Sequence, residues 1–153
     1  IQSQLFSYIT LTNFDSEFDK IFIILDRDRH SFTKEQFDRV LTESREHNIN
    51  LGITNPCFEF FLLLHFDDIN DLDSDELIEN KKTGRKTFVE KQLNDCLKKH
   101  TKKSFKKNNY DTEFFINQTE TALNNSQYFE TNNNKLKNNL GSSVVNIVNE
   151  MIE

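Results

Sequence analysis

The sequence predicts an α/β fold with a parallel sheet at its core and a mainly helical C-terminal part. An unbroken apolar run at residues 21–25 gives the segment 20–25 the character of a buried strand, and a helix and a second strand follow it. Further along, apolar residues recur at helical spacing. At 153 residues the chain is one domain by length, with the core over about 1–66 and the helical extension over about 67–153.

The first expected elements are a helix over residues 2–11 and a polar connection over 13–19 that leads into the strand 20–25. Because the apolar run of this strand does not alternate with polar residues, it suits the centre of a parallel sheet that is covered on both faces. The chain opens with Ile1 in the middle of an amphipathic segment. We therefore expect that residues upstream have been lost.

A strand, a helix and a second strand are expected next. Ser31 or Thr33 can cap a helix that ends near His47, and residues 50–54 form a short strand. This order predicts a right-handed βαβ unit, which places the carboxyl ends of both strands at the same edge of a parallel sheet.

Asn55 and Pro56 predict the start of the next helix, with Asn55 as its N-cap and proline at its first position. This helix, over 56–66, is apolar nearly all round and must lie in the core. Beyond it, helical spacing returns in three segments that are joined by polar connections, one of them rich in lysine. The three segments lie around residues 88–97, 114–123 and 144–151.

The composition limits the function and location of the protein. A net charge of -6 argues against a general nucleic-acid coat, so any polynucleotide contact must use a local basic patch. No apolar run approaches the roughly 20 residues of a membrane span, and no secretory signal is visible. Cys57 and Cys96 read as reduced core residues. The expected location is the cytoplasm, without a membrane partner.

Acidic residues follow the first strand at the edge of the sheet where ligands bind in open α/β folds. Asp26 and Asp28 lie one residue apart there, while Asn55 and Glu59 follow the neighbouring strand. Two carboxylates so close can turn toward one cation, and Mg²⁺ prefers carboxylate oxygens. The alternative is that Asp26 and Asp28 cap the following helix or solvate the loop.

Other side chains near these strand ends also allow both a functional and a structural interpretation. Glu59 lies in an apolar helix, where a metal role or the favourable helix dipole can account for it. His30, directly after the acidic pair, is better placed for chemistry than His65, which reads as a core histidine. Arg27 can contact a substrate phosphate or remain a solvated cation. Cys57, expected at the second helical position, is open to a lowered pKa, but we interpret it as a packing residue.

Two motifs carry a resemblance to a known family. Residues 25–30 (LDRDRH) and residues 54–66 (TNPCFEFFLLLHF) resemble the signatures of the RloB family of Toprim-type proteins. These are the small partners of RloA-like ATPases in bacterial anti-phage abortive-infection loci, and the lactococcal AbiL type is the first relative to name. A weaker similarity follows at Lys106, Lys107 and the helix expected from Ser142.

The resemblance implies a Toprim/Rossmann-like parallel sheet and a bound Mg²⁺ or Mn²⁺ held by Asp26 and Asp28. It also implies phosphodiester cleavage or transfer. The family's glutamate from an earlier strand has no counterpart here, because Glu17 precedes the strand by too few residues. This form of the chain can therefore be inactive.

The leading hypothesis is a nuclease subunit that cuts RNA or DNA and is controlled by an ATPase. The alternatives are a haloacid-dehalogenase-like phosphohydrolase, in which the first aspartate attacks phosphorus, and a non-catalytic interaction subunit. The sequence also allows a homo-oligomer. The residues expected to act in catalysis are Asp26, Asp28, His30 and Glu59. Those expected to contact substrate are Arg27, Asn55, Lys103, Lys106 and Lys107, the lysines coming from a basic patch over 98–107.

Overall fold

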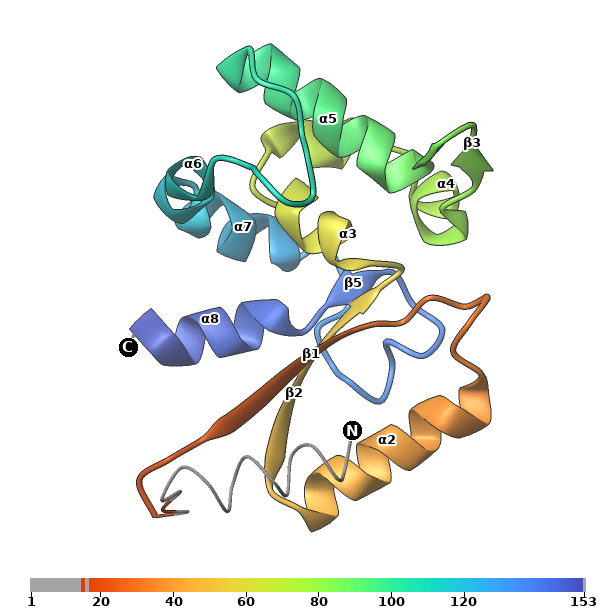
Figure 1. The fold of residues 1–153 in the computed structure, drawn as a ribbon, viewed down its shortest axis with the longest axis vertical. Helices are drawn as coiled ribbons and strands as arrows, with labels where there is room; N and C mark the ends of the chain where they lie inside the picture. Colours follow the sequence, from red (N-terminus) through yellow and green to blue (C-terminus); the bar gives the residue numbers. More distant parts are fainter. Residues whose placement is uncertain (1–14, 16, 153) are drawn as a thin grey trace.

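The computed structural model describes residue 15 and residues 17–152, which form a mixed α/β fold (Figure 1). In this part of the chain a three-stranded sheet and a two-stranded hairpin accompany seven α-helices. The strands are β1 (Ile21–Asp26), β2 (Ile49–Asn55), β3 (Lys82–Thr83), β4 (Lys86–Thr87) and β5 (Gly141–Ser142). The helices are α2 (Lys34–Glu46), α3 (Phe58–Leu63), α4 (Ser74–Glu79), α5 (Phe88–Thr101), α6 (Thr112–Asn117), α7 (Thr119–Ser126) and α8 (Val144–Ile152). The helix expected over 2–11 lies outside the described residues.

The main sheet has the strand order β1-β2-β5. β1 and β2 are parallel, in a register that runs from Ile21 opposite Ile49 to Asp26 opposite Thr54. This confirms the predicted strand–helix–strand unit with both strand ends at one edge. β5 pairs with β2 in the antiparallel direction, so the sheet is mixed, and the expected parallel core is confirmed only in the β1–β2 pair. A two-residue strand contains too few residues to show an apolar pattern, so the sequence did not reveal it.

Helix α2 confirms the predicted cap and end. Thr33 accepts from the backbone N–H of Gln36, whose side chain accepts from the Thr33 backbone N–H, and His47 ends the helix. This reciprocal capping box satisfies two N–H groups that the helix itself leaves free. The inner face of α2 packs on one face of the sheet in a small core cluster. Its buried members are Phe37, Leu41, Leu51, Ile53 and Leu136.

Helix α3 begins two residues later than the sequence predicted. Asn55 remains in β2, where it pairs with Gly141, and the Asn55–Pro56 peptide bond is cis. Cys57 is the N-cap and Phe58 the first helical residue, so the expected cap at Asn55 is wrong. The helix also stops at Leu63, earlier than the expected residue 66.

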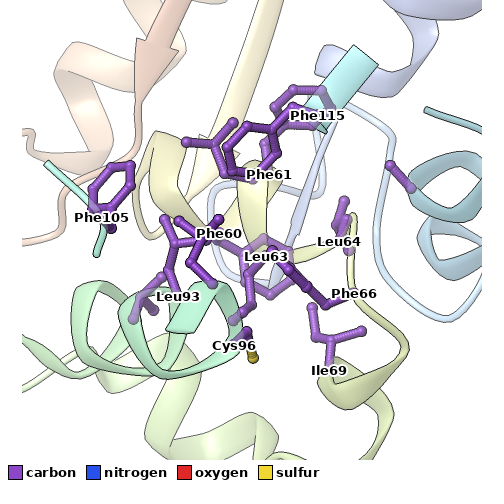
Figure 2. Packing of buried hydrophobic residues seen from close by; sticks show 14 of the residues in the cluster. Phe60, Phe61, Leu63, Leu64, Phe66, Ile69, Leu93, Cys96, Phe105 and Phe115 are labelled. Atoms are coloured by element: carbon purple, nitrogen blue, oxygen red, sulfur yellow. The ribbon is translucent and has the colours of Figure 1, made fainter. Parts of the chain in front are cut away.

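The predicted core position of α3 is confirmed. Its side chains fill a larger cluster between the sheet and the C-terminal helices (Figure 2). Phe60 and Leu63 are fully buried, and α5 contributes Leu93 and Cys96 to the same cluster. Both cysteines are free thiols. The segments expected to be helical in the C-terminal part correspond to α5, α6 with α7, and α8.

Helix α8 covers the face of β2 that is opposite to α2. The close approach depends on Gly52, because a Cβ atom there would lie 2.8 Å from Ile147 Cδ1 and 3.2 Å from Val144 Cγ2. Within the described residues, no helix is both long enough and apolar enough to cross a membrane.

Candidate functional site

Asp26 ends β1 and turns its carboxylate toward the start of α3. The Phe58 backbone N–H donates to Asp26 Oδ1 at 2.8 Å. Burial raises the pKa of Asp26, the charge of Glu59 raises it further, and the Phe58 hydrogen bond and Lys107 oppose the rise. Asp26 is therefore a partly desolvated carboxylate that caps α3, whereas the sequence suggested a cap for the helix that follows β1.

Glu59 lies beside Asp26 in the first turn of α3 and is only 7% exposed. Its charge is balanced by Lys107, whose Nζ lies 2.7 Å from Glu59 Oε1 and 3.0 Å from Glu90 Oε1. Although burial works against the charged form, these two carboxylates raise the pKa of Lys107. An ammonium group thus bridges two acids next to Asp26.

Glu90 is the member of this group that sequence reasoning missed. It lies in the first turn of α5, where Glu90 Oε2 accepts from the Thr87 backbone N–H at 2.9 Å. Burial works against its charge, but the hydrogen bonds from Thr87 and Lys107 lower the pKa of Glu90 overall. The T-x-x-E spacing of Thr87 and Glu90 predicts a helix start, but the contact with Lys107 depends on folding.

Asp28 lies in the exposed loop after β1 and is held by that loop itself. Asp28 Oδ1 accepts from the His30 backbone N–H at 3.0 Å, and Asp28 Oδ2 accepts from Ser31 Oγ at 2.7 Å. The hydrogen bond from Ser31, followed by that from His30, lowers the pKa of Asp28. Its charge contributes to the raised pKa of Asp26, and the His30 side chain is exposed on the same loop.

Arg27 points to the other face of the sheet, because side chains alternate along a strand. It is 2% exposed, its guanidinium carbon lies 5.3 Å from the centre of the Phe37 ring, and its Nε donates to the Lys137 carbonyl at 3.3 Å. The neighbouring Arg29 donates to the Asn138 carbonyl at 2.7 Å. These contacts hold the segment before β5, and they do not favour the predicted phosphate contact at Arg27.

Asn55 binds the same segment. Its amide nitrogen donates to the carbonyls of Leu136 at 2.8 Å and Asn139 at 2.9 Å, and the residue is fully buried. Its oxygen, Oδ1, has no hydrogen-bond partner among the described residues. The structure therefore gives Asn55 a structural partner, and its predicted substrate contact gains no support.

The three predicted lysines share one loop after α5 but differ in their partners. Lys103 Nζ pairs with Asp111 Oδ2 at 2.5 Å, while Lys107 pairs with the acids described above. Lys103 and Lys106 line a surface pocket together with Tyr110. In the part of the chain that the structure describes, no carboxylate pairs with Lys106.

Cys57, which is half-buried, and His65, which is buried, lie beside or behind this site. Burial, followed by the charge of Glu59, raises the pKa of Cys57 well above its ordinary value, so the lowered pKa considered for it is wrong. His65 Nδ1 lies 3.1 Å from the Phe61 carbonyl, and burial lowers the pKa of His65. The ring packs edge-on against Phe61 and Phe115, which confirms a core histidine.

The acidic side chains near the end of β1 give partial support to the predicted site for a divalent cation. Among the described residues, no group of three or more His, Cys, Asp or Glu side chains is arranged to hold a metal ion. Asp26 Oδ2, however, accepts no hydrogen bond from any described residue, and Asp28 lies close enough to act on it electrostatically. Mg²⁺ is commonly held by one or two carboxylates with water completing its shell, so Asp26 Oδ2 leaves a position for such an ion, whereas both oxygens of Asp28 already accept hydrogen bonds.

Comparison with known proteins gives one match. The family model described as "RloB-like protein" matches residues 4–151, which is nearly the whole chain. No curated protein and no solved structure matches the chain.

Proposed function

Because the chain belongs to the RloB-like family, we propose that it is a Toprim-type, metal-dependent nuclease subunit of an anti-phage abortive-infection system. In this proposal an RloA-like ATPase controls the cleavage of RNA or DNA. The observation that carries the proposal is the Asp26 carboxylate, which is partly desolvated, has one oxygen without a hydrogen bond from the described residues, and lies beside Glu59. Carboxylates in such surroundings are frequent at functional sites.

Asp26 and Asp28 would hold the Mg²⁺ or Mn²⁺. When bound there, a divalent cation would supply Lewis-acid chemistry, polarising a phosphoryl oxygen and lowering the pKa of bound water. The chain's own contribution is to fix the two carboxylates, through the Phe58 N–H for Asp26 and through Ser31 for Asp28. His30, exposed on the same loop, is the side chain proposed to exchange a proton with the substrate.

Glu59 has a different place in the proposal. Its carboxylate is already paired with Lys107, so it supports the site by its charge and by holding the 102–111 loop against α3. The pocket lined by Lys103 and Lys106 belongs to this loop and would receive the substrate backbone. Arg27 and Asn55 stay predicted contacts without structural support.

The test is a cleavage assay with the protein and its partner ATPase on RNA and DNA, in Mg²⁺ or Mn²⁺. We expect cleavage that is abolished by Asp26→Ala and by Asp28→Ala. It should be unchanged by Asp75→Ala, which removes an exposed carboxylate from α4. No cleavage by the complex, or cleavage that survives Asp26→Ala, would sink the proposal. Turnover of an aryl phosphate without nucleic-acid cleavage would favour a phosphohydrolase.

A non-catalytic interaction subunit is the second candidate function. It is favoured by Lys107, which neutralises Glu59 and Glu90 beside Asp26 instead of leaving these acids for a cation. Phage challenge of cells separates the two functions. Protection that persists with the Asp26→Ala and Asp28→Ala double variant supports the interaction subunit, and lost protection with normal protein levels supports the nuclease.

A further inference from the structure

The β3–β4 hairpin concentrates positive charge in an acidic chain. Residues 81–87 contain four basic side chains and no acidic one, while the whole chain has a net charge of -6. Lys81 pairs with Glu79 at 3.0 Å. Within the described residues, no acid or other side-chain partner is recorded for Lys82, Arg85 or Lys86, and all three residues are exposed.

Two hydrogen bonds hold the base of the hairpin, and a glycine turn forms its tip. The Phe88 N–H donates to the Lys81 carbonyl at 2.9 Å, and the Val89 N–H donates to Asn80 Oδ1 at 2.9 Å. At the tip, Gly84 has a φ of 67° in the first position of a two-residue turn, where type II′ hairpins favour glycine. The exposed cations are therefore presented on an ordered element.

The hairpin continues directly into the wall of the candidate site. β4 ends at Thr87, which caps α5, and Glu90 in the first turn of α5 holds Lys107. Lys107 in turn contacts Glu59. The hairpin thus lies next to the N-terminal end of α5 (Figure 1), and Glu90 in the first turn at that end contacts Lys107 of the 102–111 loop.

We propose that the β3–β4 hairpin binds the phosphodiester backbone of a nucleic acid beside the Asp26 and Glu59 carboxylates. The choice of polyanion rests on the proposed nuclease function. Binding to phosphate releases counterions and needs cations that are free to exchange them. Like Lys106 of the pocket described above, Lys82 and Arg85 meet this need without breaking an ion pair. Lys103 and Lys107 would first have to leave Asp111 and Glu59.

Binding in the absence of divalent cations tests the hairpin separately from cleavage. Fluorescence anisotropy with labelled RNA and DNA oligonucleotides in EDTA would compare Lys82→Gln/Arg85→Gln with Lys34→Gln/Arg39→Gln. The second pair removes the same charges from exposed positions on α2. We expect the hairpin variant to bind about tenfold more weakly and to lower the salt slope by about two, since each phosphate contact contributes roughly one.

The control double variant should bind as the unmodified protein does, and so should Lys82→Arg/Arg85→Lys, which preserves both charges. Equal losses in the two Gln variants, no loss in either, or no binding of nucleic acid by the unmodified protein would each overturn the hairpin assignment. So would preferential binding of the hairpin to phosphatidylserine vesicles. If the hairpin variant binds more weakly but the protein does not cleave nucleic acid in Mg²⁺, the hairpin assignment is supported and the proposed nuclease function is contradicted.

Discussion

Lys107 lies with its ammonium nitrogen 2.7 Å from Glu59 Oε1, although the two residues come from a surface loop and a core helix. The Glu59 side chain is 10% exposed, so its charge has little water to stabilise it. An unpaired charge at such a position is costly. The contact therefore holds the 102–111 loop against α3 and at the same time neutralises the charge of Glu59.

Lys107→Met should destabilise the protein by about 1–2 kcal/mol, because it leaves Glu59 without its counter-ion while the exposed lysine end limits the cost. Urea unfolding measures the change. The matched control is Lys103→Met, which removes an exposed pair with Asp111 and should therefore cost clearly less than Lys107→Met. Equal costs for the two variants would contradict the role given to Lys107, and adding Glu59→Gln to Lys107→Met should recover stability.

Asp26→Asn should abolish Mn²⁺ binding, measured by electron paramagnetic resonance, without lowering the unfolding midpoint. The amide oxygen can still accept from the Phe58 N–H, and the substitution removes a carboxylate whose pKa is raised by burial. Asp75→Asn serves as the exposed control. Unchanged Mn²⁺ binding by Asp26→Asn would place the cation elsewhere.

His65 should make the fold sensitive to mild acid. Because burial lowers its pKa in the folded state below the ordinary 6.5, the unfolded chain takes up a proton first as the pH falls. Stability is therefore unaffected above about pH 6.5 and decreases below it, by up to about 1.36 kcal/mol per pH unit. Urea unfolding at several pH values should show a smaller slope for His65→Gln. An identical slope in both proteins would show that His65 takes up its proton equally well when folded.

Asn55→Ala should cost about 1–3 kcal/mol in urea unfolding, because it leaves the buried Leu136 carbonyl and the partly buried Asn139 carbonyl without a donor. Asn50→Ala is the control, since this amide makes a single 3.4 Å contact with the Ile21 carbonyl at an exposed position. If Asn55→Ala were as stable as the control yet bound nucleic acid less tightly, the predicted substrate contact would be restored.

The sequence predicted the elements whose signals are local. The apolar run of β1 and the Thr33 cap of α2 depend on neighbouring residues, and both appear where expected. The nearly continuous apolar residues of the α3 segment likewise identified it as a core helix. Its start was misplaced because Asn55 is a good cap in isolation, and only the distant Gly141 and Leu136 hold it in the sheet.

The candidate site was predicted in part, for the same reason. Asp26 and Glu59 come together because two parallel strands end at one edge, which the element order predicts. The contacts of Glu90 and Lys107 depend on a loop closing over α3, and no pattern in the sequence encodes that path. The alternation of the strand also turned Arg27 away from Asp26, although the two are adjacent.

The antiparallel strand β5 has a consequence for the order in which the protein assembles during synthesis. The Asn55 amide bonds to the Leu136 carbonyl, which is synthesised 81 residues later. The Ile53 N–H bonds to Ser143 Oγ, which is synthesised 90 residues later. Such distant partners slow folding and leave apolar segments uncovered on the growing chain. Nascent chains arrested with residue 126 just outside the ribosome should therefore be digested rapidly around β2, and chains extended past α8 should resist.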